Sequence, residues 1–216
     1  MARVVVTRRL PDGSLDPLLE AGHEVVTNDD DRPFDRAALL DAAAGADAIV
    51  CLLTDRIDAE VLEAGAAGGR LRVVANVAVG YDNVDVATAA RLGITVTNTP
   101  GVLTETTADT TWLLILAARR LASDAEADLR AGRWSGWGFE DHLSLDVHGA
   151  TLGLVGYGRI GRAVARRAEG FGLRVLHHTR HDTGESGWTS DLDELLGTSD
   201  IVSLHVPLAD ATRHLI

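Results

Sequence analysis

The strongest chemical signal in the 216-residue sequence is the glycine-rich run GYGRIG at positions 156–161. The apolar stretch Thr151–Val155 precedes it and a helical stretch follows it, which is the context that a dinucleotide-binding turn requires. In such a turn Gly156 allows the tight bend, Gly158 lets the backbone approach a pyrophosphate, and Gly161 lets the helix pack closely on the strand. The helix N-terminus then offers free N–H groups to the phosphates. A tight strand–helix turn that binds nothing is the alternative.

The end of the next strand bears on which dinucleotide would bind. In NAD-specific sites a carboxylate about 20 residues past the motif accepts hydrogen bonds from the ribose 2′-hydroxyl. Here the strand ends in Thr179 and Arg180, with no carboxylate at that place. Because an arginine can pair with a 2′-phosphate through a bidentate fork, the sequence favours NADPH over NADH. Asp182 lies two residues further on and could still reach a ribose, so an NAD-dependent site stays open.

Several histidines near these strand ends raise the question of a metal. His177 and His178 are neighbours on a strand and should point to opposite faces, so they cannot easily share one ion with His181. We therefore predict no metal site. His205 lies in SLHVP at a later strand end. We interpret it as a packed, hydrogen-bonded histidine rather than a catalytic one.

Composition and charge exclude several classes of function. The net charge of −12 disfavours binding to nucleic acids and to anionic membranes, because like charges repel. All 20 basic residues are Arg, so neither a Walker A loop nor a Schiff-base lysine is present. Cys51 is the one cysteine, which rules out a disulfide within the chain and a thiolate zinc cluster. No apolar run approaches the roughly 18 residues of a membrane span or forms a signal peptide, so a cytoplasmic location is expected.

The elements that position these residues follow an alternating pattern. Apolar strands separated by helices indicate an α/β protein with parallel sheets covered on both faces. In the first hundred residues the expected strands are Arg3–Thr7, His23–Thr27, Ala48–Leu53, Leu71–Val79 and Ile94–Thr97, and the expected helices are Ser14–Ala21, Asp35–Ala44, Ala59–Ala64 and Val84–Leu92. In the second series the expected strands are Thr151–Val155, Leu173–His178 and Ile201–Val206, with helices over Arg159–Gly170 and Leu192–Leu196.

Between the two series the sequence breaks at Thr99-Pro100-Gly101. The long helix predicted over Glu105–Leu121 is apolar nearly all round, so we expect it to be buried between domains or subunits. Gly132–Gly149 follows as a loop-rich connection that contains Trp134 and Trp137. A subunit contact and local packing of the loop are equally compatible with these tryptophans.

Long colinear stretches resemble the D-isomer-specific 2-hydroxyacid dehydrogenases, most closely the glyoxylate/hydroxypyruvate reductase branch. The matching stretches are NVAVGYDNVDVATAARLGITVTNTPGVLTETTADTTWLLILAARR, GATLGLVGYGRIGRAVARRAEGFGLRVLHHTR and SLHVPLADATRHLI. The resemblance implies two Rossmann/flavodoxin-like domains with parallel sheets. Residues 1–98 would be the substrate domain, flavodoxin-like and incomplete, and residues 99–216 would be the NAD(P)-binding Rossmann domain, truncated at its C-terminal side.

The resemblance also implies site residues. The backbone at Val79 and Gly80 would hold the substrate carboxylate, which suits a glycine with a free N–H, although Asp82 or Asn83 capping the next helix would equally explain a plain turn there. The residues implied at the cofactor are Thr110 nearby, Gly156 in the turn, Gly158, Arg159, Ile160 and Gly161 at the pyrophosphate, Thr179 and Arg180 at the adenosine ribose, and Val206 and Pro207 at the nicotinamide side.

The catalytic Arg, Glu and His of the resembled family lie beyond the last matching stretch, so no catalytic residue is assigned here. We therefore expect a fragment of a longer protein in which Ile201–Val206 forms an uncovered apolar sheet edge. The resemblance implies that the full-length parent reduces a small 2-oxo acid, glyoxylate or hydroxypyruvate, with NAD(P)H as a homodimer. The alternative is a non-catalytic dinucleotide-binding or dimerisation fragment. Another Rossmann enzyme, such as a methyltransferase, fits the long matches poorly.

Overall fold

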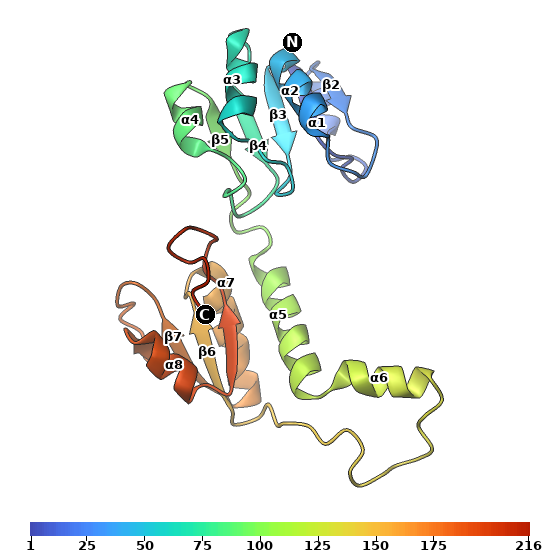
Figure 1. Ribbon diagram of the computed structural model, residues 1–216, viewed down its shortest axis with the longest axis vertical. Coiled ribbons are helices and arrows are strands. Elements are labelled where there is room, and N and C mark those ends of the chain that lie inside the picture. Colours follow the sequence, from blue (N-terminus) through green and yellow to red (C-terminus); the bar gives the residue numbers. More distant parts are fainter. The chain divides into compact units, whose positions relative to one another are not determined.

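The computed structural model describes residues 1–216 and divides them into two compact units (Figure 1). The first unit comprises Met1–Pro100 together with Pro207–Ile216, and the second comprises Gly101–Val206. The sequence assigned everything from residue 99 onward to one domain. The structure instead groups Pro207–Ile216 with the first unit, which differs from that assignment.

The first unit is built on a parallel sheet of five strands in the order β2-β1-β3-β4-β5. This is the doubly wound, flavodoxin-like order, and it confirms the predicted fold class. The sequence extended β4 too far, because the apolar residues after Asn76 belong to a turn rather than to the strand. The strands are β1 (Arg3–Val6), β2 (Glu24–Thr27), β3 (Ala48–Cys51), β4 (Val73–Asn76) and β5 (Thr95–Thr97).

Helices cover this first sheet, and an aspartate begins most of them. Asp35, Asp58 and Asp85 each accept a hydrogen bond from the N–H three residues ahead, which satisfies a donor that the helix itself cannot. The core between sheet and helices is aliphatic, with Ile49 and Leu62 fully buried. The helices are α1 (Asp16–Glu20), α2 (Arg36–Gly45), α3 (Ala59–Ala67) and α4 (Val86–Arg91).

The second unit carries a parallel sheet of four strands in the order β8-β7-β6-β9. Counted from β6, this order reads 3-2-1-4, which matches the first four strands of the Rossmann sheet. The order reverses between β6 and β9, and ligands of such sheets bind at the carboxyl ends of the strands that flank this point. The strands are β6 (Thr151–Val155), β7 (Arg174–His178), β8 (Trp188–Thr189) and β9 (Ile201–Leu204).

Helices pack on both faces of this second sheet. Leu152 and Leu154 of β6 join the cluster formed by α7 (Arg159–Ala168), which is followed by the short 3-10 helix η1 (Glu169–Phe171). Gly153 faces the opposite side, where a Cβ would lie 2.7 Å from Leu195 of α8 (Leu192–Thr198). The glycine thus allows α8 to approach the middle of the sheet closely.

The long helix after the break is α5 (Thr104–Arg119), and it packs on α7. Trp112 donates from Nε1 to the Val164 carbonyl at 3.0 Å, and its ring stacks on Phe171 at 4.7 Å. This chain alone does not cover α5 on all sides, because Leu113 and Leu114 are 65% and 64% exposed, and the predicted burial between domains or subunits stays a prediction.

A second helix, α6 (Ala122–Arg130), follows α5 and was not expected. Leu121 separates the two helices with a left-handed backbone, φ 52°. The left-handed conformation is costly for a branched side chain, and here it ends α5 and changes the direction of the chain. The sequence analysis predicted that this helix ends at Leu121, whereas α5 ends at Arg119.

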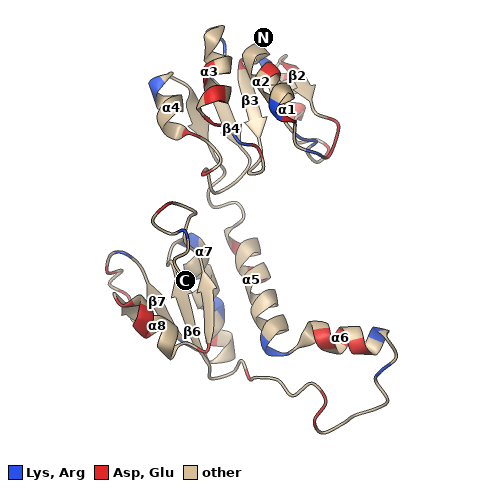
Figure 2. Ribbon diagram, viewed as in Figure 1, with Lys and Arg blue, Asp and Glu red and all other residues tan.

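β9 forms an edge of its sheet, and Val202 and Leu204 are exposed on it, as the sequence predicted. None of the helices combines the length and the apolar character that a membrane span needs. Figure 2 marks acidic residues on the ribbon of α3, α6 and α8, so negative charge is present in both units rather than gathered in one of them.

Candidate functional site

The glycine turn between β6 and α7 brings backbone atoms unusually close together. Gly156 has φ 96°, and a Cβ on it would lie 2.6 Å from the carbonyl oxygen of His205. A Cβ on Gly161 would lie 2.5 Å from the carbonyl oxygen of Gly156. These two glycines therefore allow the tight bend and the close approach of the helix that the sequence predicted.

Gly158 lies at the mouth of the same turn and has the opposite surroundings. It is the residue before the first turn of α7, and no atom lies within 4 Å of the position that its Cβ would take. No side chain caps the helix, so its first N–H groups lack acceptors. Open space, free donors and the positive end of the helix dipole all fit a pyrophosphate.

A stack of three side chains links this turn to β7. The Tyr157 ring lies 3.8 Å from the His177 ring, and the Arg162 guanidinium lies 4.6 Å from the Tyr157 ring on which it rests. Arg162 also pairs with Glu185 in the loop after β7. His177 is fully buried, with Nε2 2.7 Å from the Thr183 hydroxyl. Burial lowers the pKa of His177, and the nearby charge of Arg162 lowers it further, so the buried ring stays neutral.

The sequence did not assign this stack a role, because the residue between the first two glycines of the motif has no defined function. A signal was nevertheless available. Tyr157 lies in the turn two residues after β6, and His177 lies near the end of β7, which pairs with β6.

The residues after β7 are mostly polar, and they include Thr179, Arg180 and Asp182. Arg180 is exposed and makes no ion pair or hydrogen bond within the protein. Thr179 donates to the His181 carbonyl at 2.6 Å and accepts from Trp188 Nε1 at 3.1 Å. Asp182 accepts the N–H of Gly184 at 2.8 Å, so the nearby carboxylate is engaged in its own turn.

Of the other residues implied at the cofactor, Val206 lies at the glycine turn, with Cγ1 3.0 Å from the Cβ position of Gly156. Pro207 follows it in the chain and is exposed. Thr110 lies on α5, where its hydroxyl donates to the Thr106 carbonyl of the same helix at 3.1 Å. The structure thus brings Val206 to the turn but leaves the Thr110 hydroxyl engaged with its own helix.

The histidines are held by hydrogen bonds. His205 Nε2 lies 2.9 Å from the Ser203 hydroxyl, which confirms the predicted packed state, and burial lowers the pKa of its ring. His178 Nδ1 lies 3.1 Å from the Thr189 carbonyl. The structure contains no group of three His, Cys, Asp or Glu side chains placed to hold a metal ion.

In the first unit, Val79 and Gly80 lie in the turn between β4 and α4. The Val79 carbonyl accepts from Asn98 Nδ2 at 2.8 Å, and the Gly80 carbonyl accepts from Asn76 Nδ2 at 2.9 Å. Their N–H groups have no acceptor within the protein, so they are available to an anion. Neither asparagine was singled out from the sequence, although each stands at the carboxyl end of a parallel strand.

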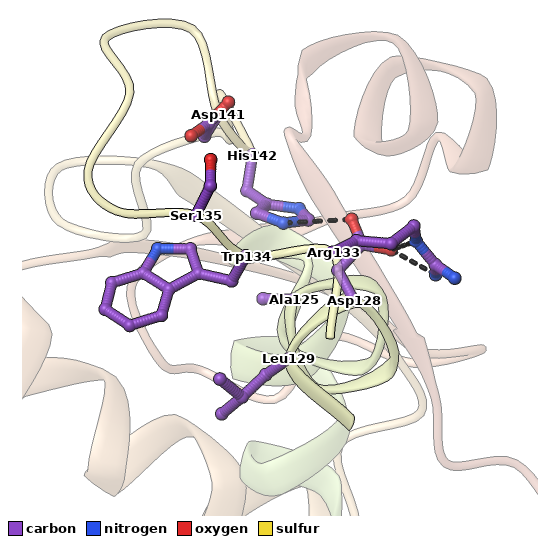
Figure 3. Close-up of a pocket in the computed structure, with 8 residues that line it drawn as sticks. All are labelled: Ala125, Asp128, Leu129, Arg133, Trp134, Ser135, Asp141 and His142. Atoms are coloured by element: carbon purple, nitrogen blue, oxygen red, sulfur yellow. Dashed lines mark hydrogen bonds and ion pairs between the residues drawn. The ribbon is translucent and has the colours of Figure 1, made fainter. Parts of the chain in front are cut away.

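A pocket lies between α6 and the segment that follows it (Figure 3). Within it, Asp128 accepts from Arg133 Nε at 2.7 Å and lies 3.3 Å from His142 Nε2. Both partners therefore engage the carboxylate of Asp128. None of the site residues derived from the sequence lines this pocket.

Comparison with known proteins decides the family. The model of the D-isomer specific 2-hydroxyacid dehydrogenase family, catalytic domain, matches residues 4–199. The chain belongs to this family. The resemblance noted from the sequence is thus confirmed, and proteins of this 2-hydroxyacid dehydrogenase family bind NAD(P).

Several relatives of this 2-hydroxyacid dehydrogenase chain have curated names or solved structures. The glyoxylate reductase of Thermococcus onnurineus is 44% identical over 99% of the chain and 66% of its own length. The structure of the TT0316 protein from Thermus thermophilus matches with a TM-score of 0.90 and 46% identity, over 99% of this chain and 67% of that one. The structure of a glyoxylate reductase from Paecilomyes thermophila matches with a TM-score of 0.83 and 30% identity, over 99% of this chain and 67% of that one. The chain spans 65% to 66% of the length of the curated relatives it matches.

The glycine geometry predicts that two substitutions in the dehydrogenase turn act differently. Gly156→Ala should destabilise the protein by about 1–3 kcal/mol, because the new Cβ needs a positive φ and meets the His205 carbonyl. Gly158→Ala should change the free energy of unfolding by less than about 0.5 kcal/mol, because its Cβ meets no protein atom. It should nevertheless weaken dinucleotide binding by tenfold or more, about 1.4 kcal/mol.

Urea unfolding and fluorescence titration with NADPH and NADH measure the two effects separately. Unaltered affinity for both dinucleotides in a folded Gly158→Ala protein would contradict a pyrophosphate site at this turn.

Proposed function

We propose that the protein carrying this chain reduces a small 2-oxo acid, such as glyoxylate or hydroxypyruvate, to the 2-hydroxy acid with NAD(P)H. The observation that carries the proposal is the open turn at Gly158, beside the point where the strand order reverses. The curated relatives named glyoxylate reductase support the substrate class. The first unit would hold the substrate and the second the dinucleotide, in the cytoplasm, where reduced nicotinamide cofactors are available.

The residues present suit these tasks. The pyrophosphate would lie on the backbone of Gly158, Arg159, Ile160 and Gly161, and the substrate carboxylate on the N–H groups of Val79 and Gly80. When bound, the reduced nicotinamide supplies the hydride for the carbonyl carbon of the substrate. We assign the remaining cofactor contacts to Thr110, Gly156, Thr179, Arg180, Val206 and Pro207.

We further propose that NADPH is favoured over NADH. Arg180 is exposed, lacks an ion-pair partner and directly follows Thr179 at the end of β7. The neighbouring carboxylate of Asp182 accepts the Gly184 N–H through Oδ1, so one of its oxygens is engaged within its own turn. A 2′-phosphate would meet a free guanidinium there, which can bind it through two parallel hydrogen bonds.

Arg180→Gln should raise the dissociation constant for NADPH by about 10- to 100-fold, because hydrogen bonds to a charged group contribute about 1.5–3 kcal/mol. NADH binding should change less than about twofold, since NADH lacks the phosphate. Arg174→Gln is the matched control, because Arg174 is also exposed and unpaired but begins β7. Fluorescence titrations with NADPH and with NADH measure the two dissociation constants. An equal loss of affinity for both cofactors in Arg180→Gln would contradict the NADPH preference.

The exposed apolar side chains of the second unit support a homodimer. We define the arm as residues 121–146, which contain α6 and the segment after it. Trp137 and Phe139 pack edge to face at 5.8 Å on the arm, yet they are 82% and 81% exposed. Leu113 and Leu114 expose a further apolar stripe on α5. Clusters of exposed aromatic and aliphatic side chains mark protein–protein contacts, and a second copy of the chain is the partner we propose.

Replacing Trp137 and Phe139 together by serine should raise the dimer dissociation constant at least about tenfold, because interface aromatics contribute about 2 kcal/mol or more each. Sedimentation equilibrium over a range of concentrations measures the constant. Leu19→Ser is the control, since Leu19 is an exposed leucine on α1 of the other unit. A monomeric unmodified protein at every concentration would contradict the dimer.

The activity itself is tested by following NADPH oxidation after glyoxylate or hydroxypyruvate is added to the full-length protein. We expect turnover there and a rate lower by at least about 10²- to 10⁴-fold for residues 1–216 alone, because a positioned acid–base group contributes about that factor. Dinucleotide binding by residues 1–216 without turnover agrees with this expectation. Failure of the full-length protein to reduce any small 2-oxo acid would contradict the proposed function.

A further inference from the structure

In the turn between β4 and α4, two successive backbone carbonyls accept hydrogen bonds from the segment that follows β5. The Ala78 carbonyl accepts the N–H of Thr99 at 2.9 Å, and the Val79 carbonyl accepts from Asn98 Nδ2 at 2.8 Å. Asn98 and Thr99 directly follow β5 (Thr95–Thr97). One short segment therefore fixes two successive carbonyls on the same side of the turn.

The opposite side of the turn presents donors as a direct consequence. A trans peptide points its C=O and the following N–H in opposite directions, and the chain contains no cis peptide bond. The Thr99 contact therefore turns the Val79 N–H away from β5, and the Asn98 contact does the same for the Gly80 N–H. Both N–H groups lack an acceptor within the protein, and both residues are exposed. Two adjacent donors on one side match the two oxygens of a carboxylate.

The base of the turn is fixed independently of Asn98. Asn76 is buried, donates to the Gly80 carbonyl at 2.9 Å and exchanges amide hydrogen bonds with Asn83 at 3.2 Å. Asn83 also donates to the Leu52 carbonyl at 3.1 Å. These contacts hold the peptide after Gly80, whereas the peptide between Val79 and Gly80 is held by Asn98 alone among the side chains.

We propose that Asn98 is a positioning residue: its side-chain amide holds the Val79–Gly80 peptide so that the Gly80 N–H faces the substrate carboxylate. This inference rests on the proposed function, which places that carboxylate at Val79 and Gly80. Glycine tolerates a wide range of backbone angles, so the peptide before it can rotate unless a partner holds it. Asn98 supplies that partner from the other side of the peptide and does not itself touch the substrate.

The test compares the Asn98→Leu variant with the unmodified sequence, both in the full-length protein. Leucine has nearly the same size but no donor, and Asn98→Ala is a second variant should leucine disturb the packing. Asn28→Leu is the matched control, because Asn28 donates to the Thr7 carbonyl at 2.9 Å in the same unit. Residual dipolar couplings report the direction of the Gly80 N–H bond without any ligand. We expect this coupling to change in the Asn98 variants and to stay unchanged in Asn28→Leu.

Oxamate, a stable carboxylate analogue of glyoxylate, then probes binding through the amide shifts of Val79 and Gly80. We expect its dissociation constant to rise about tenfold in the Asn98 variants, as the loss of one hydrogen bond to a charged group implies. An unchanged coupling or an unchanged oxamate affinity in these variants overturns the positioning role while leaving the proposed function intact. No oxamate shift in the unmodified full-length protein contradicts the proposed function, and the substrate role of Asn98 with it.

Discussion

Backbone N–H groups without an acceptor are the feature on which both proposed sites depend. A folded chain leaves few such donors buried, so those that remain free must face solvent or a ligand. In the second unit they belong to the first turn of α7, which no side chain caps. In the first unit they belong to Val79 and Gly80, whose neighbouring carbonyls are held by the segment after β5. Each set of donors is accessible because a glycine, Gly158 or Gly80, adds no side chain in front of it.

Charge has to be arranged locally, because the chain as a whole carries −12 and repels a dinucleotide. Three of the arginines on α7 are neutralised: Arg162 pairs with Glu185, and Arg166 and Arg167 pair with acidic residues of α5. Arg159, at the start of the helix, has no ion-pair partner, and the same is true of Arg180 after β7. The free positive charge of this region therefore lies beside the glycine turn and the end of β7, where a phosphorylated dinucleotide would place its own charges.

The sequence predicted most of the sheet architecture because apolar strands and helix caps are local signals. β6 was predicted with its observed bounds, whereas α6 was missed because Leu129 is the only large apolar residue in ASDAEADLR. β4 was overextended because Val77 and Val79 continue the apolar pattern after the strand has ended. Asn98 lies beyond such reasoning, since its partner is the carbonyl of Val79, 19 residues earlier, and only the pairing of β4 with β5 brings them together.

The stack of His177, Tyr157 and Arg162 connects two parts of the dinucleotide site that the sequence treats as separate motifs. Tyr157 stands between the two glycines that shape the turn, and its ring lies on His177 near the end of β7. Arg162 also rests on the Tyr157 ring and pairs with Glu185, in the loop that begins at Arg180. Because His177 is buried and bonded to Thr183 of the same loop, the loop is held at two points. The side chain between the glycines is therefore connected, through His177 and Arg162, to the loop that carries Arg180.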